Sequence, residues 1–155
     1  MTSTVVPSRQ VRPAADEDCG ALQALYSECR ELAEWLPEPA RASSDFARDT
    51  EGERILVAIG ASGVLEGFVS VWEPDSFIHH LYVHPQSRAQ GVAIGLLASL
   101  KSLPFPWRLK CLRSNAGALG FYANLGWVEC GRGDGDEGPY LVLQLQSWPL
   151  KRGSC

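Results

Sequence analysis

The chain has 155 residues, of which 45% are hydrophobic and 21% charged, the composition of a globular protein long enough to bury a core. Its net charge of −4 and its pI near 5.3 argue against a general nucleic-acid binder or a binder of anionic membranes. No apolar run approaches the length of a membrane span, and the first ten residues lack the apolar segment of a signal peptide.

In chain order, the sequence first predicts a short strand over residues 10–13 and then an amphipathic helix with Asp16 as its N-cap. Apolar residues three and four apart define the buried face of this helix: Leu22, Leu25, Tyr26, Cys29, and Leu32 or Ala33. Two prolines end the helix. Residues 35–53 are polar, with one helical turn expected near residues 45–49.

Three strands are expected next. Residues 55–59 and 64–72 flank a glycine-containing turn and predict a hairpin. A second turn leads into a strand over residues 77–83. This strand has to stop before Pro85, because proline cannot donate a hydrogen bond to a neighbouring strand.

The segment after that strand contains the first motif, R-x-x-G-x-A, which runs from Arg88 to Ala93. A helix follows, with Ala93, Leu96, Leu97 and Leu100 on one face. The start of a helix leaves backbone N–H groups unpaired and carries positive potential, which suits a phosphate-type anion. The other common phosphate loops are not supported, since there is neither G-x-x-x-x-G-K-[ST] nor G-x-G-x-x-G.

The second motif is N-x-x-A-x-x-F-Y-x-x-x-G-W, which runs from Asn115 to Trp127 and follows an expected strand over residues 107–112. Asn115 is a good N-cap, and Gly126 stands where a helix commonly ends in the left-handed conformation. A final hairpin is expected, with strands over residues 127–130 and 140–145. Its glycine-rich acidic loop, residues 131–138, lacks the ligand spacing of a calcium-binding EF-hand.

The two motifs, in this order and with a strand between them, resemble the two signature motifs of the GNAT N-acyltransferase superfamily. The resemblance implies a mixed α/β fold over a single domain, residues 1–155. It comprises a mostly antiparallel sheet of about seven strands, about four flanking helices, and a splay between the fourth and fifth strands. The activity it implies is acetyl-CoA-dependent N-acetyltransfer to a primary amine of a small molecule or peptide, by direct attack in a ternary complex.

The resemblance also implies a binding site for acetyl-CoA. The backbone of Leu81, Tyr82 and Val83 is expected to meet the acetyl and pantetheine end, and the loop of the first motif to hold the pyrophosphate. The remaining cofactor-binding residues that it implies are Arg88, Ala89, Gln90, Gly91, Val92, Ala93, Ile94, Asn115 and Tyr122. Ala89 and Ala93 stand where many family members carry glycine, but neither side chain is large enough to block the backbone.

Two residues are expected to carry the chemistry. Tyr122 matches the family tyrosine that protonates the departing sulfur, and tyrosine is protonated at neutral pH. His79 stands where many relatives carry a proton-accepting glutamate or histidine. A packing role for Tyr122 and a structural role for His79 are the alternatives. No metal site is expected, because His79 and His80 should point to opposite faces of the strand and His80 and His84 are about 13 Å apart at strand rise.

The acceptor cannot be identified from the sequence. The segments that line the acceptor cleft in the family carry acidic and aromatic residues here: Glu34, Trp35, Glu38, Asp45, Asp49, Asp134, Asp136 and Glu137. This mixture suits a cationic amine, and a solvated acidic surface explains it equally well. A silent acyl-CoA-binding sensor is the alternative to an enzyme. Neither nucleic acid nor membrane is expected as a partner, and a homodimer is left open.

The cysteine pattern predicts the cellular compartment. The chain has five cysteines, an odd number, and none forms a C-x-x-C pair. They are expected to be reduced thiols of a cytoplasmic protein, without a zinc site or a disulfide framework.

Overall fold

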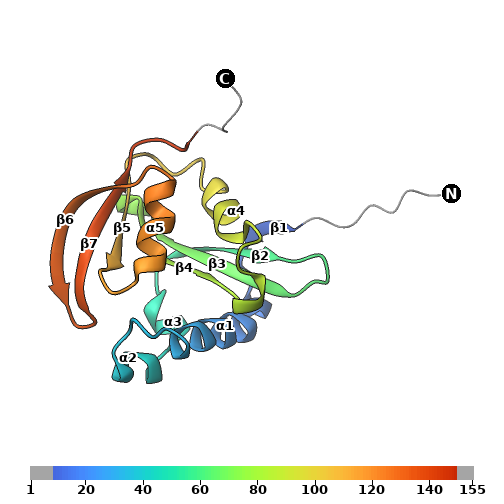
Figure 1. The fold of residues 1–155 in the computed structure, drawn as a ribbon. Coiled ribbons are helices and arrows are strands. Elements are labelled where there is room, and N and C mark those ends of the chain that lie inside the picture. Colours follow the sequence, from blue (N-terminus) through green and yellow to red (C-terminus); the bar gives the residue numbers. More distant parts are fainter. Residues whose placement is uncertain (1–8, 150–155) are drawn as a thin grey trace.

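The computed structural model describes residues 9–149, which form one seven-stranded sheet flanked by helices (Figure 1). The strand order is β1-β2-β3-β4-β5-β7-β6, and every neighbouring pair is antiparallel except β4 and β5. The strands are β1 (Gln10–Pro13), β2 (Arg54–Ile59), β3 (Leu65–Trp72), β4 (Phe77–Val83), β5 (Trp107–Leu112), β6 (Val128–Gly135) and β7 (Gly138–Leu145). The helices are α1 (Cys19–Glu31), α2 (Glu38–Ala42), α3 (Phe46–Asp49), α4 (Val92–Ala98) and α5 (Ala116–Asn124).

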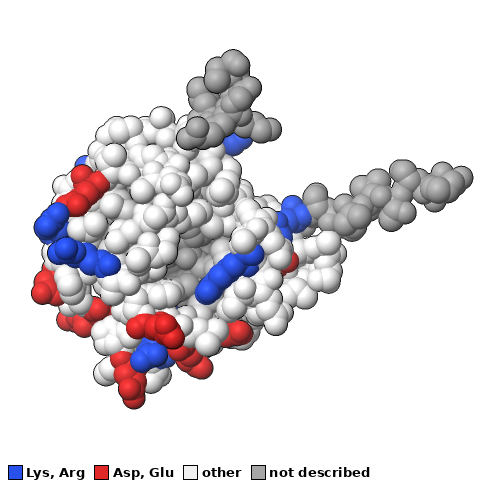
Figure 2. Space-filling model, in the orientation of Figure 1, with Lys and Arg blue, Asp and Glu red and all other residues white. Residues whose placement is uncertain are grey.

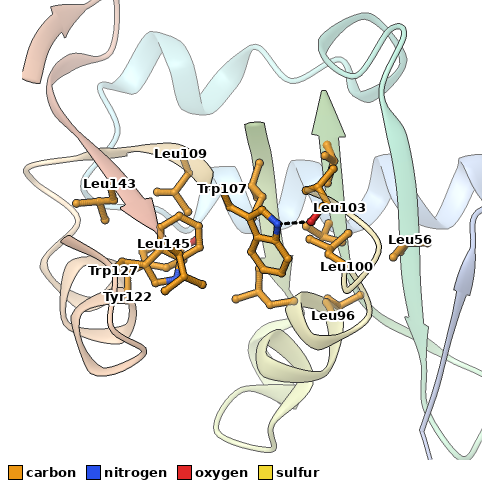
Figure 3. Packing of buried hydrophobic residues seen from close by; sticks show 14 of the residues in the cluster. Leu56, Leu96, Leu100, Leu103, Trp107, Leu109, Tyr122, Trp127, Leu143 and Leu145 are labelled. Carbon is orange, nitrogen blue, oxygen red and sulfur yellow. Dashed lines mark hydrogen bonds between the residues drawn. The ribbon is translucent and has the colours of Figure 1, made fainter. Parts of the chain in front are cut away.

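The sheet buries a hydrophobic core on each face. On one face α1 and α3 pack over β2, β3 and β4 around Tyr26 and Phe68, and on the other α4 and α5 pack around Trp107 (Figure 1). The Trp107 indole is fully buried and donates a hydrogen bond to the carbonyl of Leu103, at 2.9 Å (Figure 3). None of the helices within residues 9–149 is long and apolar enough to cross a membrane.

Strands β4 and β5 separate soon after they meet. The parallel pairing covers only Phe77 with Arg108 and Ile78 with Leu109, so among the described residues the rest of β4 has no strand partner on its β5 side. On its other side β4 pairs with β3, and the register shifts between Ser70 and Val71. This shift leaves His79 as an extra residue in β4, a β-bulge. The expected splay and mixed sheet are therefore confirmed.

Several sequence predictions are confirmed at the level of single elements. Strands β4 and β5 have the expected bounds, and the Asn115 side chain caps α5 by accepting a hydrogen bond from the Ala118 N–H, at 3.1 Å. Gly126, after α5, has a φ of 95°. The expected cap of the first helix is wrong, because Asp16 begins a separate 3₁₀ turn and α1 starts after Asp18. The Asp18 carboxylate accepts a hydrogen bond from the Ala15 N–H, which favours that extra turn.

The acidic loop predicted between the last two strands is also wrong. Strand β6 continues to Gly135 and β7 begins at Gly138, so only Asp136 and Glu137 connect them. Glycine and aspartate disfavour strands as isolated residues, but here each residue from Gly131 to Gly135 is paired with β7. Tertiary pairing therefore outweighs the local preference.

Candidate functional site

A cleft of about 560 Å³ lies where β4 and β5 diverge. Its walls come from the bulged part of β4, from β5 and α5, from α1 and the segment after it, and from the tip of the β6–β7 hairpin. Figure 2 shows a depression in the middle of this face, with acidic side chains gathered below it around α2 and the hairpin. His79, Leu81, Tyr82, Asn115 and Tyr122, all expected in the site, line this cleft.

A second groove, of about 410 Å³, lies farther along the chain, where β4 leads into α4. The loop backbone is unusual here, because both Ala89 and Gly91 have a positive φ, of 62° and 81°. The groove is lined by Val83, Ser87, Arg88, Ala89, Gly91, Val92, Ala93, Ile94 and Phe121. A Cβ atom on Gly91 would meet no atom within 4 Å. The turn therefore leaves open space beside the N–H groups that begin α4.

Gln90 is the loop residue that lines neither cavity. Its backbone carbonyl and its side-chain oxygen both accept hydrogen bonds from Arg9, at 3.2 Å each, and its own amide donates to the Gln86 carbonyl. Arg9 also forms an ion pair with Glu66. The Gln90 side chain is therefore used to hold the loop, and Arg9 adds a positive charge beside it.

Tyr122 lies on the cleft wall and is 8% exposed. Its ring packs edge-on against Trp127, with ring centroids 5.4 Å apart. Among residues 9–149 its hydroxyl makes no hydrogen bond, and burial raises the pKa of Tyr122. The side chain is thus a neutral phenol with its proton available to a molecule in the cleft. Cys111 lies on the same wall, and burial raises the pKa of this thiol to about 11, so it is protonated at neutral pH.

Half of the eight residues expected around the acceptor line the cleft: Trp35, Asp49, Asp136 and Glu137. Two of these carboxylates already have partners. Asp49 accepts a hydrogen bond from the Tyr26 hydroxyl at 2.8 Å, and Glu137 pairs with Arg30 at 2.8 Å. Glu34, Glu38, Asp45 and Asp134 do not line it.

The bulge in β4 overturns the expected placement of the two adjacent histidines. The sequence predicts that His79 and His80 point to opposite faces, with His79 beside Leu81 and Val83. The extra residue breaks the alternation, and the two imidazole rings instead lie together, with centroids 4.0 Å apart. Both rings approach the carboxylate of Glu53, at the start of β2. His84 lies elsewhere and caps a 3₁₀ turn by accepting from the Gln86 N–H.

Sequence reasoning missed two charged residues of the site, Glu53 and Arg30. The Arg30 side chain is 8% exposed and bridges α1, the Ala40 carbonyl and Glu137 at the hairpin tip. The long sequence separations, 107 residues for Arg30 and Glu137 and 26 for Glu53 and His79, leave no local pattern to detect. The one available signal is the placement of Arg30 among the apolar residues on the buried side of α1.

Several solved structures with the same fold carry acetyltransferase names. A GCN5-related N-acetyltransferase from Rhodopseudomonas palustris matches with 24% identity and a TM-score of 0.76. The match covers 94% of this chain and 100% of the chain in that structure. The Escherichia coli ribosomal-protein-S18-alanine N-acetyltransferase matches with 16% identity and a TM-score of 0.68, covering 94% of this chain and 97% of its own.

The structure of yncA from Salmonella typhimurium, which holds its cofactor acetyl-CoA, matches with 19% identity and a TM-score of 0.69, covering 96% of this chain and all of its own. No curated protein matches the sequence. The model of the acetyltransferase (GNAT) family matches residues 20–127, from the start of α1 to the end of the second motif. This chain belongs to the GNAT acetyltransferase family.

Proposed function

We propose that this protein is an acetyl-CoA-dependent N-acetyltransferase that moves the acetyl group directly to a primary amine of a small molecule or peptide. The observation that carries the proposal is the succession of two cavities along β4, the cleft at the splay and the groove at the start of α4. Together they offer separate places for the reacting and the phosphate ends of one extended cofactor.

The splayed part of β4 suits the pantetheine arm. Beyond Ile78 the edge of β4 that faces β5 has no strand partner, so an extended chain of amides can add to it as another strand would. The acetyl end would then lie near Leu81 and Val83, whose backbone N–H groups are candidates for stabilising the tetrahedral oxyanion. The pyrophosphate would lie against the loop of residues 88–94.

The chemistry needs a base and an acid on the cleft wall. The neutral acceptor nitrogen would attack the thioester carbonyl while His79 takes a proton from it, and His79 would then release that proton to solvent. When the tetrahedral intermediate collapses, the carbon–sulfur bond breaks and the Tyr122 hydroxyl protonates the thiolate. Tyr122 regains its proton from solvent. The protonated Cys111 thiol favours this direct route, because a neutral thiol is a poor nucleophile for a covalent intermediate.

The acceptor that best suits the cleft is a cationic amine. Trp35 offers an aromatic wall, and the carboxylates of Asp49, Asp136 and Glu137 lie around the same space. Arg30 offsets part of that negative charge, which favours an acceptor with one or two positive charges over a highly charged polycation. We also propose a cytoplasmic location, because the cysteines are odd in number and include no C-x-x-C pair, a pattern typical of reduced thiols.

The test is acetyl transfer from acetyl-CoA to a panel of amines: polyamines, aminoglycosides, and peptides with a free amino terminus or lysine. Loss of thioester absorbance and the gain in acceptor mass from the replacement of one hydrogen by an acetyl group would be followed together. An acceptor-dependent rate is expected. Acetyl-CoA binding without turnover across the panel would instead support the catalytically silent sensor.

A further inference from the structure

The cluster of Glu53, His79 and His80 is not explained by cofactor binding or by any motif in the sequence. Its ligand-type atoms all lie within 4.8 Å of one another, although Glu53 precedes β2 and the two histidines belong to β4. The bulge at His79 brings the second ring to the same side as the first. The bulge therefore has a local consequence: both imidazoles reach one carboxylate.

The three side chains differ in exposure in an ordered way. The Glu53 side chain is 7% exposed and that of His80 is 10%, whereas that of His79 is 45% exposed. Both imidazoles line the cleft, and His79 is the one that is open to it. Glu53 Oε2 is hydrogen-bonded to His79 Nδ1. Oε1 is buried, makes no hydrogen bond within residues 9–149 and lies 3.8 Å from His80 Nδ1. A buried carboxylate thus stands directly behind an imidazole that is open to the cleft.

An ionised carboxylate can only accept hydrogen bonds, so the nitrogen that contacts it carries the hydrogen. Burial by itself would raise the pKa of Glu53, but the contacts with His80 and His79 outweigh it and leave this pKa below its ordinary value. The carboxylate is therefore ionised at neutral pH. In neutral His79 the hydrogen then resides on Nδ1, and Nε2 has the free lone pair.

We propose that Glu53 is a positioning residue that holds His79 in the Nδ1–H tautomer, so that Nε2 accepts the proton of the acceptor amine. In this step the N–H bond of the acceptor breaks and an Nε2–H bond forms. The resulting imidazolium keeps its Nδ1–H bond to Glu53, whose negative charge stabilises it. The inference rests on the proposed function and adds to it the residue that prepares the base.

His80 belongs to the cluster without having the same role. Its Nδ1 is 2.8 Å from the Ser70 hydroxyl on β3, and its ring packs against Tyr26, so it is fixed on both sides. Two imidazoles and a carboxylate also resemble a metal-ligand set. Both Nδ1 atoms are already in hydrogen bonds, with Glu53 and with Ser70, and this arrangement favours hydrogen bonding over the coordination of a metal ion.

The first test reads the tautomer directly and does not depend on activity. The chain has three histidines, so a long-range ¹H–¹⁵N NMR spectrum of the imidazoles contains three spin systems. Their assignment comes from the spectrum of His79→Gln. Neutral His79 in the unmodified protein is expected to show the Nδ1–H pattern. An Nε2–H pattern for His79 would overturn the proposal.

The second test is the variant Glu53→Gln, with Glu51→Gln as its matched control. Glu51 is exposed and lies two residues away, so its variant removes the same charge without touching the imidazoles. In Glu53→Gln, kcat is expected to fall at least about tenfold, and the acidic limb of the kcat/KM profile to move to lower pH. Glu51→Gln should match the unmodified enzyme. Equal profiles for all three proteins would overturn the proposal.

Two further measurements keep the interpretation unambiguous. If Glu53→Gln folds poorly, Glu53→Asp keeps the charge but moves it away from the ring, and it should give a smaller loss and a smaller shift of the pH profile in the same direction. Zn²⁺ added to the metal-free protein should neither bind tightly nor restore activity after treatment with a chelator. Tight binding with such restoration would make the cluster a metal site and overturn the proposal.

The tautomer test also separates this inference from the proposed function. If His79 shows the expected Nδ1–H tautomer but the protein acetylates no amine, the result would count against the proposed function alone.

Discussion

At the scale of single residues, the Tyr122 hydroxyl permits the most direct test of the chemistry. Tyr122→Phe keeps the ring and its packing on Trp127, and it removes only the proton offered to the thiolate. General acid catalysis contributes about 10²–10⁴-fold, so kcat should fall by about that factor when chemistry is rate-limiting. The affinity for acetyl-CoA should change less than about tenfold, since a hydrogen bond to sulfur adds little.

Steady-state kinetics with acetyl-CoA check this prediction, and Tyr140→Phe is the matched control, because it removes a hydroxyl from the same cleft. A higher pH, or a donor with a more acidic thiol, should partly rescue Tyr122→Phe, because such a thiolate leaves without a proton. If Tyr122→Phe turned over at the unmodified rate while chemistry is rate-limiting, Tyr122 would be a packing residue only.

Gly91 permits an equally local test of the phosphate loop. Its φ of 81° is unfavourable for a β-branched residue, and a side chain there would project into open space beside the loop. Gly91→Val should therefore sharply weaken CoA binding while leaving binding of dephosphorylated pantetheine little changed. Gly95→Ala, on α4 with room for a Cβ, is the control. Calorimetry with both ligands measures the effect, and equal losses would place the pyrophosphate elsewhere.

Two residue-level predictions in the second motif succeed, because they depend only on neighbouring residues. Asn115 caps a helix that begins next to it, and Gly126 adopts the conformation that ends the same helix. Glu53 could not have been found in this way, because its contact with His79 depends on a bulge between two strands and on a partner 26 residues away.

At the scale of elements, the β6–β7 hairpin is attached to α1 by the ion pair of Glu137 with Arg30. Glu137→Gln should loosen the hairpin tip and raise KM for the acceptor by about fivefold, the effect of losing roughly 1 kcal/mol. KM for acetyl-CoA should be unchanged, since the groove proposed for its pyrophosphate lies at α4, away from the hairpin. Asp134→Asn, on the same hairpin but off the cleft wall, should have neither effect. Equal acceptor KM values in both variants would show that the ion pair of Glu137 with Arg30 does not hold the hairpin tip in place for the acceptor.

The position of His80 between β3 and α1 predicts a pH dependence of stability. Burial lowers the pKa of His80, although Glu53 and Asp49 act in the opposite direction, and the charge of His79 adds to the lowering. The unfolded chain, with an ordinary imidazole, therefore binds more protons at mildly acidic pH. The contribution of His80 to the free energy of unfolding is fully present above about pH 6.5. It is lost as the pH falls below that value toward the lower pKa that His80 has in the folded state.

Urea unfolding at pH 7.5, 6.5 and 5.5 would measure this loss, with a slope of at most about 1.4 kcal/mol per pH unit for one proton. His80→Gln removes the titrating group and should show a shallower slope. Identical slopes in the two proteins would show that His80 does not govern this pH range.

The hairpin also shows why elements are harder to predict than caps. Its glycines and acidic residues are individually typical of loops, and only pairing along β7 makes them a strand. Strands β4 and β5 were predicted with correct bounds, because β4 is rich in aromatic and β-branched residues, β5 alternates apolar and basic residues, and turns bound both. The short helix α2 was missed, because two prolines near its start suggested an irregular segment.

At the scale of the whole molecule, the cleft exists because β4 and β5 pair over only two residues before they diverge. Composition and periodicity predict strands but not such a divergence, since it depends on which strands become neighbours. The splay was anticipated only through the resemblance of the two motifs to a known family. The motifs in turn lie on both sides of the splay, one after β4 and the other after β5.

Binding of acetyl-CoA across β4, α4 and α5 should therefore stabilise the molecule as a whole. A ligand that binds only the folded state, at 100 times its dissociation constant, adds roughly 2.7 kcal/mol to the free energy of unfolding. For a domain of this size the Tm should rise by roughly 5–10 °C. Differential scanning fluorimetry with acetyl-CoA, CoA and longer acyl-CoAs measures the shift, and Gly91→Val should reduce it. No shift at millimolar concentration of any of these ligands would remove the basis of the proposed activity.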